Sequence, residues 1–157
     1  MQEITHADWT IGLPDKWIDN SIVIFNGPPN DGFSPNITVL REPMTHPLSA
    51  EEYASNQLAG LMEEFNDQNY QVLEEGTVKL GELAAYYRIH SFLMDDNRSE
   101  LTQMQVYVVR GLEAITITFT HLSQWFPLQR QVFLDSLSMF SWGSRPRPVA
   151  KSVVKKP

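Results

Sequence analysis

The sequence predicts an α+β fold, a mainly antiparallel β-sheet with two main helices packed on it. Short runs rich in β-branched residues occur on both sides of one capped helical segment. The later runs follow one another through tight turns, which favours antiparallel pairing. A second helical segment follows the last of these runs. We expect three strands, a helix, four strands and a helix, in that order.

Three strands are expected before the first helix, at residues 8–13, 20–25 and 36–41. In the second of them, alternation places Ile22 and Ile24 on one face and Val23 and Phe25 on the other. Residues 27–32 are rich in Gly, Pro, Asn and Asp, which is typical of a loop.

Two helices are predicted, from residue 50 to about 65 and over 127–140. Ser49 and Glu52 have the spacing of a capping box. Gln57 lies beside the apolar stripe of the first helix, which contains Tyr53, Leu58, Leu61 and Phe65. The second helix has two apolar stripes, Phe133, Leu137 and Phe140 in one and Leu128, Val132 and Met139 in the other.

Four strands are expected after the first helix, at 70–80, 83–94, 101–110 and 114–120. Several strands are apolar on both faces, although an antiparallel sheet with one wet face alternates apolar and polar residues. Two helices can cover one face of such a sheet, or a part of each. We therefore expect a subunit, a ligand or a partner segment to cover the remaining apolar surface.

Composition is that of one soluble globular domain. The chain has 157 residues, of which 42% are hydrophobic and 20% charged, and its net charge of -7 argues against a nucleic-acid partner. We expect a single domain over 1–141. The basic tail, 142–157, is rich in Pro and Lys and is expected to be flexible, with folding back onto the acidic body or onto a partner as the alternative.

The start of the chain lacks the basic and apolar regions of a secretory signal, and no apolar run is long enough to span a membrane. We therefore expect a cytoplasmic protein without stable membrane insertion.

Catalytic motifs are missing from the sequence. There is no Gly-rich phosphate loop, no G-x-S-x-G elbow and no cysteine, and His6, His46, His90 and His121 lack the spacing of metal ligands. We expect no catalytic residue, no metal, no cofactor and no enzymatic activity.

Gln103 and Gln105 alternate onto one strand face with Tyr107. This face is either an exposed polar surface or a binding surface that presents amides to a partner. Gln57, on the edge of the first helix, has the same two interpretations.

The opening of the chain resembles the DcrB-like domain family and, within it, the Eag chaperones of bacterial type VI secretion. The resemblance rests on the Leu13-Pro-Asp-Lys-Trp17 turn followed by Ile22-Val-Ile-Phe25, on the segment 52–58, and on the strands 105–108 and 114–118. It covers residues 3–140. It implies a curved, PsbP-like antiparallel sheet with helices on its convex side.

The resemblance also implies a function and partners. Eag chaperones are cytoplasmic homodimers that shield the N-terminal transmembrane helices of PAAR-domain effectors, often Rhs toxins, and help to load them onto the VgrG spike. Such a protein contacts the spike only indirectly. The alternatives are a DcrB-like envelope protein, a small-ligand binder or enzyme on the same fold, and a PsbP-like regulator.

The resemblance further implies a binding site for the client helix. Ile22 and Ile24 would form an apolar floor, with ordinary core packing as the alternative. Gln57 and Gln105 would present amides, and Gln103 shares the face of Gln105. The remaining positions, on the neighbouring strand, are Asn36, Thr38 and Leu40. Family members often have small hydroxyl residues there, and Leu40 departs from that pattern.

Overall fold

A computed structural model describes residues 1–6, 8–80, 82–96 and 98–141. The tail predicted for 142–157 lies outside these residues. The described chain divides into two units, residues 1–20 and residues 21–141. The smaller unit is an antiparallel hairpin of β1 (Gln2–His6) and β2 (Trp9–Leu13). The sequence predicted β2 but not β1, because the polar, acidic composition of β1 is not typical of a strand.

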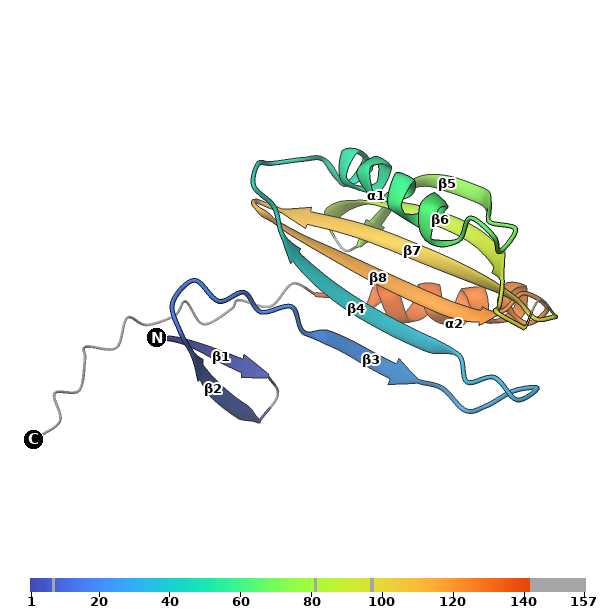
Figure 1. Ribbon diagram of the computed structural model, residues 1–157, viewed down its shortest axis with the longest axis horizontal. Helices are drawn as coiled ribbons and strands as arrows, with labels where there is room; N and C mark the ends of the chain where they lie inside the picture. Colours follow the sequence, from blue (N-terminus) through green and yellow to red (C-terminus); the bar gives the residue numbers. More distant parts are fainter. Residues whose placement is uncertain (7, 81, 97, 142–157) are drawn as a thin grey trace, which may run out of the picture. The chain divides into compact units, whose positions relative to one another are not determined.

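The larger unit contains one six-stranded antiparallel sheet (Figure 1). Its strands are β3 (Ile22–Asn26), β4 (Asn36–Pro43), β5 (Gln71–Leu80), β6 (Leu83–Leu93), β7 (Glu100–Arg110) and β8 (Glu113–Leu122). Their order across the sheet is β3-β4-β8-β7-β6-β5. Gly111 makes the tight turn between β7 and β8 with a φ of 59°, a conformation that favours glycine. The predicted fold class is confirmed.

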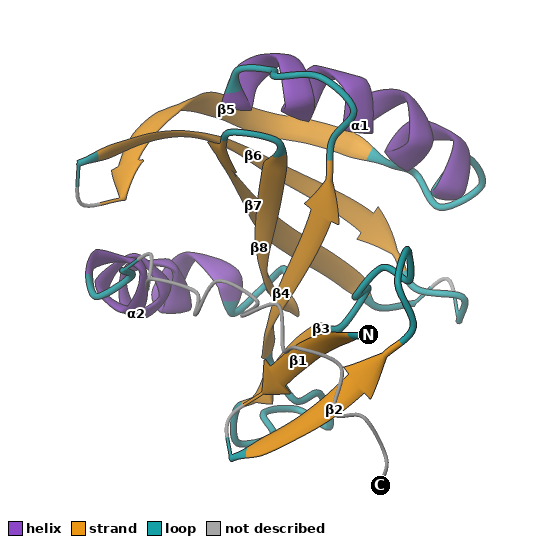
Figure 2. Ribbon diagram, turned by 90° about the vertical axis from the view of Figure 1, so that its left-hand side faces the viewer, coloured by secondary structure: helices purple, strands orange, loops and turns teal. Residues whose placement is uncertain are grey.

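The two helices, α1 (Ala50–Glu64) and α2 (Phe126–Ser138), pack on opposite faces of this sheet (Figure 2). The ring of Tyr53 in α1 contacts Tyr107 of β7, which is paired with Thr116 of β8. The ring of Phe133 in α2 contacts Phe119 of β8, and alternation places Phe119 on the face opposite Thr116. The expectation that both helices cover the convex side is therefore wrong, because their apolar stripes meet opposite faces.

Helix α1 begins with the predicted capping box. The Ser49 hydroxyl accepts from the Glu52 amide at 3.1 Å, and the Glu52 carboxylate accepts from the Ser49 amide at 2.9 Å. Tyr53 and Ala54 are buried against the sheet. Near the other end of the helix, Phe65 stacks on Phe92 with their ring centroids 4.1 Å apart.

Helix α2 uses only one of its two apolar stripes for packing. Phe126, Phe133 and Leu137 are buried, whereas the side chains of the second stripe, Leu128, Val132 and Met139, are exposed. The described part of the chain therefore covers only a part of the apolar surface of α2. Within the described residues, neither α1 nor α2 has the length and composition of a membrane-spanning helix.

Candidate binding face of the sheet

Strand register brings all the predicted sheet residues of the site onto one face of the larger unit. Three rows cross β3, β4, β8 and β7 in that order: Ile22, Leu40, Thr116 and Tyr107 in the first, Ile24, Thr38, Thr118 and Gln105 in the second, and Asn26, Asn36, Thr120 and Gln103 in the third. We call these residues the candidate face. Helix α1 packs on the same side of the sheet, mainly over β6 and β7.

The apolar part of the candidate face lies on the edge strand β3. Ile22 is 56% exposed and Ile24 is 58% exposed, so neither belongs to the core of the chain. On the opposite face of the same strand, Val23 and Phe25 are also exposed. Strand β3 therefore carries exposed large apolar side chains on both of its faces.

The threonines of β8 were not among the predicted site residues. Thr116, Thr118 and Thr120 alternate onto one face of their strand, and this was visible in the sequence. The sequence did not show that β8 lies between β4 and β7, which places these hydroxyl side chains in the middle of the candidate face. All three threonines are buried, with exposed fractions of 9%, 8% and 5%.

Gln57 lies on helix α1, which packs on the same side of the sheet as the candidate face. It lies one helical turn after Tyr53, on the same side of the helix. Tyr53 packs on Tyr107, so this side of the helix faces the sheet. The Gln57 side chain is half-buried, and its amide makes no hydrogen bond to any described residue.

A buried guanidinium organises the polar groups beneath α1. The side chain of Arg88 on β6 is 1% exposed. Its Nε donates to Glu75 at 2.8 Å, its Nη1 to the Tyr107 hydroxyl at 3.0 Å, and its Nη2 to the Ala54 carbonyl at 3.0 Å. The Tyr107 hydroxyl in turn donates to Oε1 of Gln105 at 2.5 Å. Arg88 thereby connects helix α1 to a predicted site residue.

A second buried group, His90, holds Gln103. His90 Nε2 lies 2.8 Å from Gln103 Oε1, and Nδ1 lies 3.1 Å from the Tyr70 hydroxyl. Gln103 Nε2 also donates to the Thr120 hydroxyl at 3.1 Å. Gln103 and Gln105 are thus half-buried and bonded internally, an arrangement that neither sequence interpretation described.

Burial of His90 makes the stability of the fold depend on pH. Desolvation lowers the pKa of His90 to about 4 from an ordinary 6.5. Between these values the unfolded chain binds a proton that the folded chain excludes, so stability is full above pH 6.5 and falls as the pH decreases. We expect this group to contribute a loss of about 3 kcal/mol between pH 7 and pH 4. Urea denaturation of the wild type and His90→Gln across this range measures it. Parallel curves for the two proteins would contradict the expectation.

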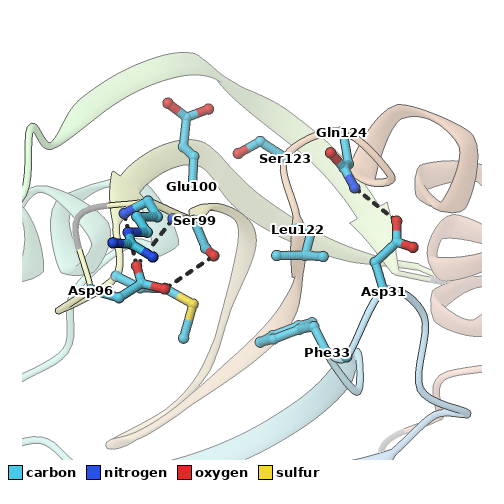
Figure 3. Close-up of a pocket in the computed structure, with 11 residues that line it drawn as sticks. Asp31, Phe33, Asp96, Ser99, Glu100, Leu122, Ser123 and Gln124 are labelled. Atoms are coloured by element: carbon cyan, nitrogen blue, oxygen red, sulfur yellow. Dashed lines mark hydrogen bonds between the residues drawn. The ribbon is translucent and has the colours of Figure 1, made fainter.

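A separate pocket of about 630 Å³ lies where the β3–β4 loop, the β6–β7 turn and the segment after β8 meet (Figure 3). None of the predicted site residues lines it. Asp31 accepts hydrogen bonds from the side chains of Gln124 and Trp125, at 2.9 Å and 2.7 Å. Asp96 accepts from the backbone amides of Arg98 and Ser99, and these bonds lower its pKa. Both carboxylates therefore hold the loops that carry them.

The architecture and its neighbours define a PsbP-like α+β domain. PA94, a protein of unknown function from Pseudomonas aeruginosa, has the same fold, with a TM-score of 0.76 and 16% sequence identity over 92% of this chain and 99% of that one. Cyanobacterial PsbP from Synechocystis sp. PCC 6803 aligns with a TM-score of 0.51 and 11% identity over 82% of this chain and 95% of that one.

The family model of DcrB matches residues 9–138, so the chain belongs to the DcrB family. No curated protein matches the sequence significantly. The identities to the two solved structures are low, and these structures therefore establish the fold alone.

Proposed function

We propose that the chain is a cytoplasmic chaperone that binds the N-terminal transmembrane helices of a PAAR/Rhs-type type VI secretion effector. In this proposal the candidate face shields the client helix and the complex aids loading of the effector onto the VgrG spike. The observation that carries the proposal is the exposure of Ile22 and Ile24 on a face that also carries the half-buried side chains of Thr38 and Gln105. The resemblance of segment 13–25 to the Eag chaperones supports the choice of client.

The chemistry of the face suits an apolar helix that also carries small polar groups. A helix meant for a membrane exposes apolar surface in water, and burying that surface stabilises a complex by about 25 cal/mol per Å². Ile22, Ile24 and Leu40 offer apolar contact, while Thr38 and Gln105 offer hydrogen bonds to Ser, Thr or backbone groups of the client. Because the polar groups of the face do not fully match an apolar helix, the complex is weak enough for the client to dissociate when the effector inserts.

The same proposal includes a homodimer. Strand β3 also exposes Val23 and Phe25 on the face that the client does not use. A second copy of the chain would remove this apolar surface from water, in keeping with the oligomeric state that the resemblance implies.

The experiment that tests the chaperone function is a substitution within the apolar floor. Ile24→Asp is expected to reduce recovery of the effector at least about tenfold, since one buried, unpaired carboxylate costs more than 1.4 kcal/mol. The tagged full chain is purified from cells that express their type VI system. Mass spectrometry then measures whether a PAAR/Rhs protein with N-terminal membrane helices is retained.

A matched control is Val132→Asp on α2, because Val132 is 59% exposed and Ile24 is 58% exposed. Val132 belongs to a helix on the opposite face of the sheet, so this variant should recover the effector as the wild type does. Equal recovery by folded Ile24→Asp, or no such effector with the wild type, would refute the proposal.

A further inference from the structure

Hydrogen bonds from buried residues fix the orientation of the Gln105 side-chain amide. From this we infer that the candidate face selects apolar helices in which a proline has freed a backbone carbonyl. The inference rests on the proposed function and deepens it, because it specifies which kind of client helix binds best. It concerns the second row of the face, where Gln105 lies in line with Ile24 and Thr38 across the sheet.

The hydrogen-bond chain fixes which end of the Gln105 amide is available. A guanidinium can only donate, so the Tyr107 hydroxyl oxygen accepts from Arg88 at 3.0 Å. The hydroxyl proton then needs an acceptor, and the amide oxygen of Gln105 lies 2.5 Å away. An amide nitrogen cannot accept this proton. Gln105 therefore directs its oxygen to Tyr107 and leaves its N–H groups without a partner among the described residues.

The buried position of Arg88 keeps this orientation from reversing. The guanidinium is held on three sides, by Glu75, by the Ala54 carbonyl of α1 and by Tyr107. Turning the Gln105 amide would leave the buried Tyr107 proton without an acceptor, which is unfavourable because a buried donor must be hydrogen-bonded. In the next row, Gln103 already uses both ends of its amide, on His90 and Thr120.

A site that presents N–H donors needs an acceptor on its ligand. Inside a regular helix every carbonyl already accepts one hydrogen bond, from the amide four residues later, so a further donor meets only its second lone pair. Proline has no N–H, so it leaves one carbonyl unpaired in the preceding turn. In a helix meant for a membrane, that carbonyl is a polar group within an apolar surface. Gln105 can satisfy it while Ile24, in the same row, contacts the apolar side chains around it.

The test uses two synthetic helices as probes. Both carry lysines at their ends and an alternating Leu/Ala core long enough to span a membrane. They differ only by alanine or proline at the centre. With the full wild-type chain we expect the proline peptide to bind about tenfold more tightly than the alanine peptide. The reason is that the Gln105 amide donates to the carbonyl that proline leaves unpaired. Fluorescence titration of labelled peptides measures both dissociation constants.

Variants assign the preference to Gln105. Gln105→Leu removes the donor and should reduce the ratio of the two constants to about one. Gln105→Glu replaces the donor by an acceptor of the same shape and should make the proline peptide the weaker ligand. Tyr107→Phe removes the group that orients the amide, so the preference for the proline peptide should fall. Gln131→Leu on α2 is the matched control and should keep the wild-type ratio.

The outcomes separate the inference from the proposed function. Failure of the wild type to bind either peptide would overturn the proposed function, and the inference with it. Equal binding of both peptides by the wild type would overturn the inference alone. The same conclusion follows if folded Gln105→Leu and folded Gln105→Glu both keep the preference for proline.

Discussion

Phe133→Ala is expected to lower the free energy of unfolding by about 3–5 kcal/mol, which is typical for a large ring removed from a packed core. Phe133 is 2% exposed, and its ring stacks on Phe119 with centroids 4.9 Å apart and planes 15° from parallel. Phe126 packs on the same Phe119 ring at 5.7 Å. Removing the Phe133 ring leaves a cavity between α2 and β8. Urea denaturation followed by circular dichroism measures the change.

Val132→Ala is the control for this prediction, because Val132 is the preceding residue of the same helix and lies in the exposed stripe. Its substitution should change the free energy of unfolding by less than about 0.5 kcal/mol. If both substitutions proved equally mild, the contact of Phe133 with Phe119 would not be what holds α2 on the sheet.

Arg88→Met is expected to destabilise the chain by about 3 kcal/mol, because several hydrogen bonds of a buried charged group are lost together. The variant leaves the Tyr107 hydroxyl and Glu75 without their donor and removes the hydrogen bond between β6 and the Ala54 carbonyl of α1. Its free energy of unfolding, from the same denaturation experiment, gives the magnitude.

An exposed ion pair provides the comparison for Arg88. Arg130 donates through both terminal nitrogens to Glu74, at 3.0 Å and 2.9 Å, but its side chain is 35% exposed. Water can solvate both charges, so Arg130→Met should cost less than about 1 kcal/mol. An Arg88→Met protein as stable as Arg130→Met would mean that desolvation of the guanidinium offsets its internal bonds.

Local sequence signals predicted most of the fold. The Ser49–Glu52 capping box placed the start of α1, and the turn residues between 94 and 114 placed the hairpins of β6, β7 and β8. These features depend on neighbouring residues alone. The choice of face for α2 was not predictable, because α2 has two apolar stripes and only Phe133 and Leu137 among its later residues find a partner surface.

The sequence predicted which residues of one strand share a face, but it did not predict which strands lie side by side. Alternation grouped Ile22 with Ile24 and Gln103 with Gln105, since successive side chains point to opposite faces. Whether the two groups share a face of the sheet depends on the pairing of β4 with β8, which joins Thr38 to Thr118. Such contacts between distant segments leave no local pattern. For the same reason the role of Arg88 beneath Gln105 was missed, although its charge within an apolar strand was a visible anomaly.

The strand order separates pairings between sequence neighbours from one pairing between distant segments. β5, β6, β7 and β8 follow one another in the chain and pair with their sequence neighbours, so their contacts close short loops. β4 reaches β8 only after a loop that contains α1 and three strands has closed, and closing it carries a larger entropic cost. The edge strand β3 is paired in the sheet through β4 alone. We therefore expect the surface proposed to hold a client to form after the hairpins of β5 to β8, and its amides on β3 to exchange faster than those of the inner strands β7 and β8.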